Sequence, residues 1–425
     1  MTAEIAVLNR QAVALAADSA VTVGVNGSQK VYNSVNKLFM LSKYAPVGVM
    51  IYGSAQLTEM PWETCIKVFR RHLGETRLPH LEDYWGELSR FIESGSSIFP
   101  KDHEAQQVRR TCYAIYSSVL QSLEQAVESR TVSGPITVSQ LRRLLGDAVE
   151  AQVTRWNDAD RLPRRSDAYG KRVASTWSSV INEVIDDVFK TLPMTRSTRQ
   201  RLLQLPGIMY TRNLFPDSTS GLVIAGFGEE DYFPSMVSFD IEGVVLQKMK
   251  FRPRTSHSVA VGNDACIAPF AQGEMVHLFM EGLDPEYRAL IDAAMEGFLS
   301  GLPDAVASAL PLSPARQRAT KRKLEALTSK VTADFQHLMR HYALERHIGP
   351  VINSVAILPK EELAAMAESL VHLTSMKRRV TMDAETVGGP IDVAVISKGD
   401  GFIWIKRKHY FDQVTNPHFL ANYYK

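Results

Sequence analysis

Apolar residues in the first fifty-odd positions follow the spacing of β-strands. Residues 12–17 are apolar at every position, and residues 4–8 are apolar except for Glu4. Residues 9–11, Asn-Arg-Gln, separate these two runs and suit a hairpin turn. The pattern predicts two short paired strands. A strand that is apolar on both faces belongs in a sheet that is covered on both sides.

Further strands are predicted beyond this hairpin, separated by short polar stretches. Asn26-Gly27 suits a turn, and Gly53-Ser54-Ala55 ends the last of these runs. The expected strands cover residues 21–25, 37–41 and 47–52.

From residue 58 the apolar spacing changes to that of amphipathic helices. In the first of them, Trp62, Cys65, Ile66 and Phe69 fall on one face. Helices are expected over residues 62–73, 81–92, 105–126, 141–153, 174–192 and 197–205.

Strand patterns return near residue 220 and again near residue 388, with helices between them. Strands are expected over residues 221–228 and 234–241, with residues 243–249 returning as a hairpin. Helices are expected over residues 274–283, 286–299, 314–345 and 360–380, before a last hairpin formed by residues 388–396 and 401–405. Residues after His409 are expected to form an irregular tail. The order is therefore strands, helices, strands, helices, strands.

The segments show no Gly-, Ser- or Pro-rich linker and no internal repeat. We therefore predict one enlarged domain over residues 1–425 rather than two independent ones.

Composition narrows the function classes. The 425 residues carry a formal net charge of +2, which gives no reason to expect a nucleic-acid or membrane partner. No apolar run approaches the roughly 20 residues of a membrane span, and the N-terminus lacks the pattern of a signal peptide. Three scattered cysteines, Cys65, Cys112 and Cys266, favour a cytoplasmic location and show no metal-binding spacing. We expect no cofactor and no metal.

Candidate chemistry gathers at the N-terminus. Removal of Met1, which a small second residue permits, would give Thr2 a free α-amine with a pKa of roughly 7.7–8.0 beside its own hydroxyl. Such an amine is a suitable general base for the hydroxyl. A lysine, Lys30, would lower the hydroxyl pKa, and Asp18 would hold that lysine charged. The backbone N–H of Gly53 would stabilise a developing oxyanion.

Each of these residues has an ordinary interpretation on its own: a strand-end aspartate is usually a turn residue, and a lone lysine is usually solvated. Their order along the chain, with the hairpin between them, favours the catalytic interpretation. Cys266 is more simply a small buried residue than a nucleophile.

The same residues carry a resemblance to a known family. Thr2, Ala16-Ala17-Asp18-Ser19, a following lysine and Gly53-Ser54-Ala55 resemble the N-terminal region of proteasome β-subunits and of the bacterial HslV peptidase, which are N-terminal-nucleophile (Ntn) hydrolases. The family lysine matches Lys30, with Lys37 as the fallback. In the family, a strand "V-I-V-A-G" and a late "S-G-G" also occur, and residues 222–226 and 387–389 resemble them.

The resemblance implies an α+β fold, the four-layer αββα Ntn-hydrolase sandwich. It covers core pieces at about residues 2–75, 218–300 and 348–411, and leaves residues 76–217 and 300–347 as helical insertions. It also implies homo-oligomers, a peptide or unfolded protein substrate, and a separate ATP-dependent unfoldase as partner.

The chain departs from the family pattern at two places. Asn263, followed by Asp264, stands where the family has an assisting serine. Ala384 and Val387 stand where the family has an acid and a serine, so that Asp383 or Glu385 would have to substitute.

The sequence therefore predicts a proteasome-like threonine peptidase in which Thr2 attacks the peptide carbonyl. Two alternatives stay open: a non-catalytic proteasome-like assembly subunit, and an Ntn amidase acting on a small-molecule amide. Sequence does not give the substrate preference, the oligomeric state or the role of the helical insertions.

Overall fold

A computed structural model describes residues 2–25, 28–94, 98–131, 134–216, 219–381 and 387–423. The chain groups into two compact units that interleave along the sequence. The first unit is formed by Met1–Leu38, Tyr232–Ser235 and Ser258–Lys425, and the second by Phe39–Asp231 and Met236–His257.

The first unit is built on a five-stranded sheet in the order β12-β1-β2-β13-β14. All four neighbouring pairs are antiparallel. Its strands are β1 (Ala3–Asn9), β2 (Ala12–Ala17), β12 (Ala265–Ala271), β13 (Asp392–Ser397) and β14 (Gly401–Lys406). Every residue of β1 and β2 is buried, as expected for apolar strands covered on both faces.

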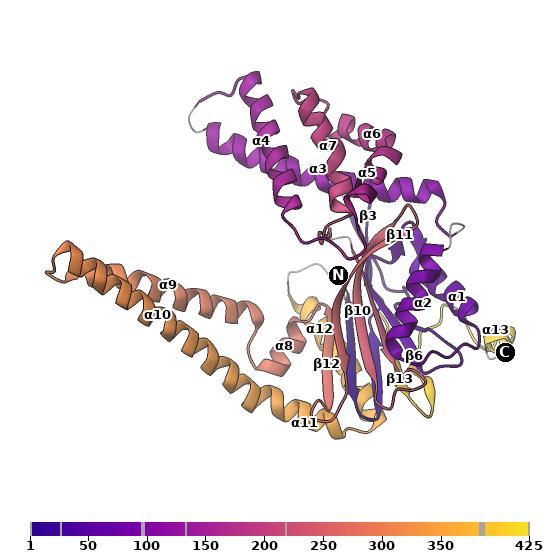
Figure 1. The fold of residues 1–425 in the computed structure, drawn as a ribbon. Coiled ribbons are helices and arrows are strands. Elements are labelled where there is room, and N and C mark those ends of the chain that lie inside the picture. The colour runs from indigo at the N-terminus through magenta and orange to yellow at the C-terminus, as the bar shows by residue number, and fades with distance from the viewer. Residues whose placement is uncertain are drawn as a thin grey trace. The chain divides into compact units, whose positions relative to one another are not determined.

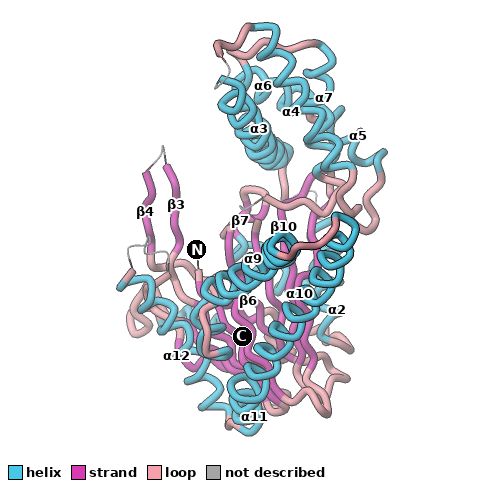
Figure 2. The backbone as a smooth tube through the Cα atoms, turned by 90° about the vertical axis from the view of Figure 1, so that its left-hand side faces the viewer, coloured by secondary structure: helices cyan, strands magenta, loops and turns pink. Residues whose placement is uncertain are grey.

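Helices cover one face of this sheet through alternate residues of β1 and β2. Ile5, Val7 and Ala14 pack in one cluster with Leu363 and Val371 of α12 (Lys360–Val380). The other helices of the unit are α8 (Glu274–Glu281), α9 (Pro285–Ala309), α10 (Pro314–Ala343), which continues through a π-helical turn (Leu344–Ile348) into α11 (Gly349–Ile357), and α13 (Pro417–Tyr423). A separate two-stranded hairpin joins β3 (Val21–Val25) to β4 (Ser28–Tyr32) and is visible in Figure 2.

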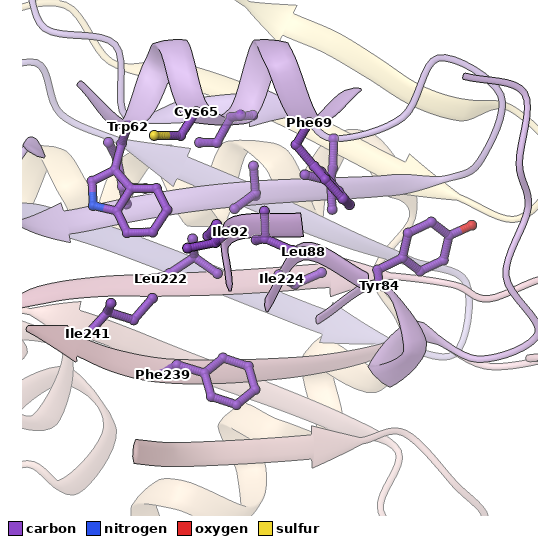
Figure 3. Packing of buried hydrophobic residues seen from close by; sticks show 14 of the residues in the cluster. Trp62, Cys65, Phe69, Tyr84, Leu88, Ile92, Leu222, Ile224, Phe239 and Ile241 are labelled. Carbon is purple, nitrogen blue, oxygen red and sulfur yellow. The ribbon is translucent and has the colours of Figure 1, made fainter. Parts of the chain in front are cut away.

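The second unit holds another five-stranded sheet, in the order β11-β10-β9-β6-β5. Its strands are β5 (Leu38–Met40), β6 (Val47–Gly53), β9 (Ser220–Gly226), β10 (Ser235–Val245) and β11 (Lys248–Ser258), with a small β7–β8 pair (Gln56–Leu57, Met60–Pro61). Two helices, α1 (Trp62–Leu73) and α2 (Leu81–Ser94), pack on it. Figure 3 shows the rings of Trp62 and Phe69 of α1 on the side of the helix that faces the sheet, and both pack in one cluster with Leu222 and Ile224 of β9.

Five more helices of the second unit form their own apolar cluster (Figure 1). They are α3 (Lys101–Thr131), α4 (Val138–Asn157), α5 (Asp167–Thr176), α6 (Ser178–Phe189) and α7 (Arg196–Met209). A capping box begins α4, because Thr137 accepts from the Gln140 N–H while the Gln140 side chain accepts from the Thr137 N–H. The described part of residues 76–217 is thus mainly helical, and its interpretation as an insertion stays a prediction.

Several predicted elements were wrong in detail. The single helix expected at 174–192 is broken at Trp177 into α5 and α6, and residues 243–245 continue β10 rather than starting a new strand. The β10–β11 turn falls at Leu246-Gln247, where both residues have positive φ.

Strand β12 was not predicted, because Pro269 interrupts its strand pattern. It lies at the edge of the sheet, where a proline is tolerated. The expected irregular tail contains α13.

The observed fold is α+β with antiparallel sheets, in agreement with the predicted class. The prediction of one enlarged domain stays a prediction, because two compact units can still fold as one.

Candidate active site

Thr2 lies directly before β1 and is held against the edge strand β12. Its carbonyl oxygen accepts a hydrogen bond from the Gln272 N–H at 3.2 Å. The side chain is 3% exposed, and its hydroxyl donates to Glu4 Oε2 at 3.1 Å. The nucleophile proposed from sequence is therefore buried beside a carboxylate.

Asp18 follows β2 and reaches the start of β1, because the antiparallel register pairs Glu4 with Ala17. Its Oδ1 accepts from the Ala3 N–H at 3.1 Å. Its Oδ2 accepts from the N–H groups of Ala20 and Gly388, at 3.2 and 3.0 Å. Asp18 therefore ties the β1 end, its own loop and the Gly388 loop together.

Lys37 supplies the ammonium group of the cluster. Its Nζ donates to Asp18 Oδ1 and lies 3.4 Å from Glu4 Oε1, and the residue is 3% exposed. The structure thus places the fallback lysine, rather than Lys30, beside Asp18.

The prediction that Asp18 holds Lys30 was wrong. Lys30 lies in β4, where the hairpin pairs it with Val23, and its side chain is exposed. Its Nζ lies 5.2 Å from the centre of the Tyr32 ring. The separate β3–β4 hairpin takes up the residues between Asp18 and Lys30, so the next lysine along the chain is the one that returns to the aspartate.

Glu4 was not among the predicted site residues. Burial raises its pKa from 4.5 to about 8; the nearby Lys37 ammonium lowers it and Asp18 raises it further. A signal was present in the sequence, because Glu4 is the one charged residue in a strand that is otherwise apolar up to its last residue, Asn9. Such residues are costly to bury and often functional.

The residue beside Thr2 is Gln272, which directly follows β12, and not Asn263 or Asp264. Asn263 forms a turn with Ala260, and Asp264 pairs with Arg10 at 2.6 Å. Both precede β12, whose antiparallel pairing with β1 brings its last residues to Thr2 and its first residues to Asn9. Because β12 was not predicted, the residues expected beside Thr2 were placed too early in the sequence, by about the length of β12.

A second layer of charge supports this end of β12. The Gln272 side-chain oxygen accepts from Arg378 Nε at 2.9 Å, and Arg378 Nη2 donates to Glu274 at 2.7 Å. Lys377 also reaches Glu274, at 2.9 Å. Helix α12 thereby holds the segment that contacts Thr2.

Gly53 ends β6 in the second unit, opposite Ser220 of β9. It has φ +73°, and an added Cβ would lie 2.4 Å from the Thr219 carbonyl oxygen, so a glycine is required there. Its role as an oxyanion donor stays a prediction.

The glycine loop after α12 is described from Val387 onward. Gly388 donates to Asp18, and Val387, buried, accepts at 3.5 Å from Ser375. Ala384, Asp383 and Glu385 lie outside the described residues.

A pocket of about 500 Å³ reaches the buried cluster from the α12 side. Asp18 lines it together with Gly388, Gly389, Ser375 and His372. The pocket gives a ligand group a route to the aspartate that carries Lys37.

The described residues contain no group of three or more His, Cys, Asp or Glu side chains arranged to hold a metal ion. Burial raises the pKa of the Cys266 thiol to about 11, which keeps it protonated and a poor nucleophile. Among the described residues, no helix is long and apolar enough to cross a membrane.

Comparison with known protein families found no matching family model, and comparison with curated proteins found no match. One hydroxyl, two carboxyl groups and one ammonium meet in a buried cluster, and these are the types of group that general acid–base chemistry on a hydroxyl uses.

Proposed function

We propose that the protein is a threonine-type N-terminal-nucleophile hydrolase that cleaves peptide bonds, with Thr2 as the nucleophile. The observation that supports this most strongly is the buried Thr2 hydroxyl, which donates to Glu4 beside the ammonium of Lys37. A threonine becomes reactive when a proton acceptor lies within hydrogen-bond reach and a cation lowers its pKa.

In the first step Thr2 Oγ attacks the carbonyl carbon of the substrate, and the hydroxyl proton passes to Glu4 in its ionised form, which a pKa of about 8 makes available near and above that pH. The Lys37 ammonium stabilises the negative charge near Thr2 while Asp18 holds that lysine in position. The proton then moves to the departing amine as the C–N bond breaks. Water then attacks the resulting ester and gives a proton to Glu4. The ester bond to Thr2 Oγ breaks as Glu4 returns that proton to Oγ, which releases the acid product and regenerates Thr2 and ionised Glu4.

This mechanism differs from the one predicted from the sequence in its proton acceptor, which is Glu4 instead of the α-amine of Thr2. Glu4 occupies the acceptor position at 3.1 Å from the hydroxyl. The α-amine of Thr2, which requires removal of Met1, is the competing acceptor, and Met1 lies outside the described residues. The two acceptors are separated by substituting Glu4.

A four-layer αββα sandwich is the finer architecture we propose. Its support is the burial of the β1 and β2 side chains that do not face α12, because Ala6, Leu8, Val13 and Leu15 are all fully buried. Each five-stranded sheet also carries helices on one face. Two such layers pack face to face in a sheet-on-sheet sandwich.

The resemblance to proteasome-like enzymes extends the proposal to the substrate and partners. Peptides or unfolded proteins are the substrate class, the chain assembles with itself, and a separate ATP-dependent unfoldase is the partner. The pocket beside Asp18 is the proposed place where a substrate group meets the cluster. The cytoplasm is the proposed location.

The test is hydrolysis of a broad panel of fluorogenic peptides and of small amides by the wild type and by Thr2→Ala. The proposal predicts turnover of at least one peptide by the wild type and background rates for Thr2→Ala with an unchanged circular dichroism spectrum. Turnover that survives in Thr2→Ala rejects the nucleophile.

Two further outcomes identify the alternatives. Turnover of small amides alone points to a small-molecule amidase. Absence of any turnover, with Met1 retained in the intact mass, points to a non-catalytic assembly subunit. Glu4→Gln then separates the two proton acceptors, because loss of turnover supports Glu4 and wild-type turnover supports the amine.

A further inference from the structure

Helices α9 and α10 lie side by side and form an antiparallel arm in the first unit (Figures 1 and 2). All their residues are described, and few are buried: Pro303 and Ala307 in α9, and Thr328 and Ala343 in α10. By contrast, α3, of similar length, buries nine. Helices of this kind take most of their stability from packing of an apolar face, so the arm has apolar surface left to cover.

The uncovered apolar side chains of α10 form one stripe. At about 100° per residue, its four members fall within about 60° of one another around the helix. They are Leu327, Val331, Leu338 and Tyr342, and Leu338 is 62% exposed. The spacing of four, seven and four residues is that of a helix-packing seam.

Helix α9 carries a broader stripe, which spans about 120° around the helix and is formed by Tyr287, Leu290, Phe298 and Leu302. Phe298 is 79% exposed, which is unusual for a large aromatic side chain outside an interaction surface.

The two stripes lie on the same side of the arm. On α9 the exposed Leu302 comes one residue before the buried Pro303, and on α10 the exposed Leu327 comes one residue before the buried Thr328. The buried residues face the neighbouring helix. Because the helices run in opposite directions, the same offset places both stripes on one flank of the pair, which makes a single apolar face.

The ion pair between Lys321 and Asp304, at 2.5 Å, sets the register of the two helices. Phe298 is as far from Asp304 along α9 as Leu327 is from Lys321 along α10, so these two side chains lie at one level. The same counting places Tyr287 level with Leu338. At these two levels along the arm, a large apolar side chain of α9 therefore lies beside one of α10, and levels without such a pair separate them.

Charge differs strongly between the two helices. In α9 the charged residues are mostly acidic: Glu286, Asp292, Glu296 and Asp304, against Arg288. In α10 they are mostly basic: Arg316, Arg318, Lys321, Arg322, Lys323, Lys330 and Arg340, against Glu325 and Asp334. The arm thus has an acidic half and a basic half.

We propose that this apolar face binds the arm of a second copy of the chain and forms a four-helix bundle. A two-fold axis that runs along the arm lays each acidic α9 over the basic α10 of the other copy. The alternative axis, across the arm, lays acidic helix on acidic helix and basic on basic, which like charges oppose. The first arrangement is closed and self-complementary, as symmetric dimers are.

The dimer also fits the side chains level by level. In this arrangement Phe298 of one copy meets Leu327 of the other, and Tyr287 meets Leu338. Apolar side chains at matched levels form the core of a bundle of this type. The inference does not depend on the proposed hydrolase activity.

Sedimentation velocity of the full chain measures the association. We expect a dimer, or an even-numbered assembly of dimers, and expect Leu327→Glu to raise the dimer dissociation constant by about 100-fold or more, because it buries a charge in the seam. Val138→Glu is the matched control, since Val138 is also an exposed apolar residue, 65% exposed, on helix α4 outside the arm. Its association constant stays that of the wild type.

Cysteine pairing tests which helices meet. We expect a mixture of Phe298→Cys and Leu327→Cys chains, allowed to exchange subunits and then oxidised, to form an interchain disulfide, and neither variant alone to do so. A monomeric wild type, equal association of Leu327→Glu and wild type, or binding of the arm to a different protein in place of a second copy would each overturn the proposal.

Discussion

Lys37 carries the positive charge of the buried cluster, between two carboxyl groups that are both almost completely buried. Asp18 is 1% exposed and Glu4 is fully buried. Their repulsion is offset by the one ammonium that reaches both. Without that ammonium, the two buried acidic groups lose the positive charge that they share. Leaving buried acidic groups without their partner strongly lowers the free energy of unfolding.

We therefore predict that Lys37→Met lowers the free energy of unfolding by about 3–5 kcal/mol. Lys30→Met is the matched control: Lys30 is exposed, and its loss changes that free energy by less than about 0.5 kcal/mol. Urea denaturation of the two variants measures both. Equal effects of the two substitutions, or a larger effect of Lys30→Met, would contradict the assignment of Lys37 to the site.

The raised pKa of Glu4 predicts how stability depends on pH. Below pH 4.5 the group is protonated in the folded and the unfolded chain. Between 4.5 and about 8 the unfolded chain loses the proton while the folded chain keeps it, so folding stability falls. Above about 8 both states are ionised and the decline stops.

Relative to Glu4→Gln, which cannot ionise, the wild type should therefore lose about 1.4 kcal/mol of stability per pH unit across that window. Denaturation of both proteins at a series of pH values measures the difference. A difference that stays constant from pH 5 to about pH 8 would show that Glu4 has an ordinary pKa and is not held as described.

At the scale of elements, helices α5 and α7 cross at a point where each helix has a glycine. An added Cβ on Gly170 of α5 would lie 2.6 Å from the Gly207 carbonyl oxygen of α7, a distance that side chains do not adopt. Helix backbones approach this closely only where no side chain stands between them. The crossing fixes how α5 and α7 pack in the helical cluster.

We predict that Gly170→Ala destabilises the fold by about 1–3 kcal/mol, because the two backbones must move apart. Gly86→Ala is the matched control, since Gly86 of α2 has open space where a Cβ would stand. It should stabilise the fold by about 0.5–1 kcal/mol through helix propensity. Thermal unfolding of both variants gives the signs, and a stabilised Gly170→Ala would refute the close approach.

Elements whose residues share one strong period were predicted well from the sequence. The bounds of α1 and α12 match the expected helices at 62–73 and 360–380, because their apolar residues keep a helical spacing to both ends. The β1–β2 hairpin was found for the corresponding reason in a strand pattern. Where the period was interrupted, by Pro269 in β12 or Trp177 between α5 and α6, the expectation failed.

The candidate site was recoverable in part. Thr2 and Asp18 follow from positions next to the ends of a short hairpin, which any antiparallel pairing brings together. The choice between Lys30 and Lys37 depends on how the chain travels between two elements, which local periodicity does not encode. The contact between Gln272 and Thr2 was missed because it depends on the pairing of β1 with β12, in which Ala3 lies opposite Ala271, more than 260 residues later in the sequence.

At the scale of the whole molecule, each compact unit is assembled from segments distant in sequence. The first unit combines the N-terminal hairpin with the C-terminal half of the chain, and the second takes the intervening segments. The chain crosses from one unit to the other several times, so neither unit is a continuous stretch. This interleaving is the physical basis for expecting the units to unfold together.

One enlarged domain predicts a single unfolding transition. Phe69→Ala, in the fully buried core beneath α1, should lower the stability of the entire chain by about 3–5 kcal/mol. Calorimetry of the wild type and the variant shows whether the whole transition shifts as one. A variant that melts in two steps, with one step at the wild-type temperature, would mean that the units are independent domains.

The central claim is that the Thr2 hydroxyl is made reactive by the buried Glu4, Lys37 and Asp18. Its most direct test is intact-mass and peptide mass spectrometry after treatment with a β-lactone, an electrophile that acylates reactive hydroxyl groups. We expect one adduct per chain, located on Thr2, strongly reduced in Lys37→Met and retained in Lys30→Met. Acylation spread over other hydroxyl residues, or absent from Thr2 while the protein is folded, would contradict the claim.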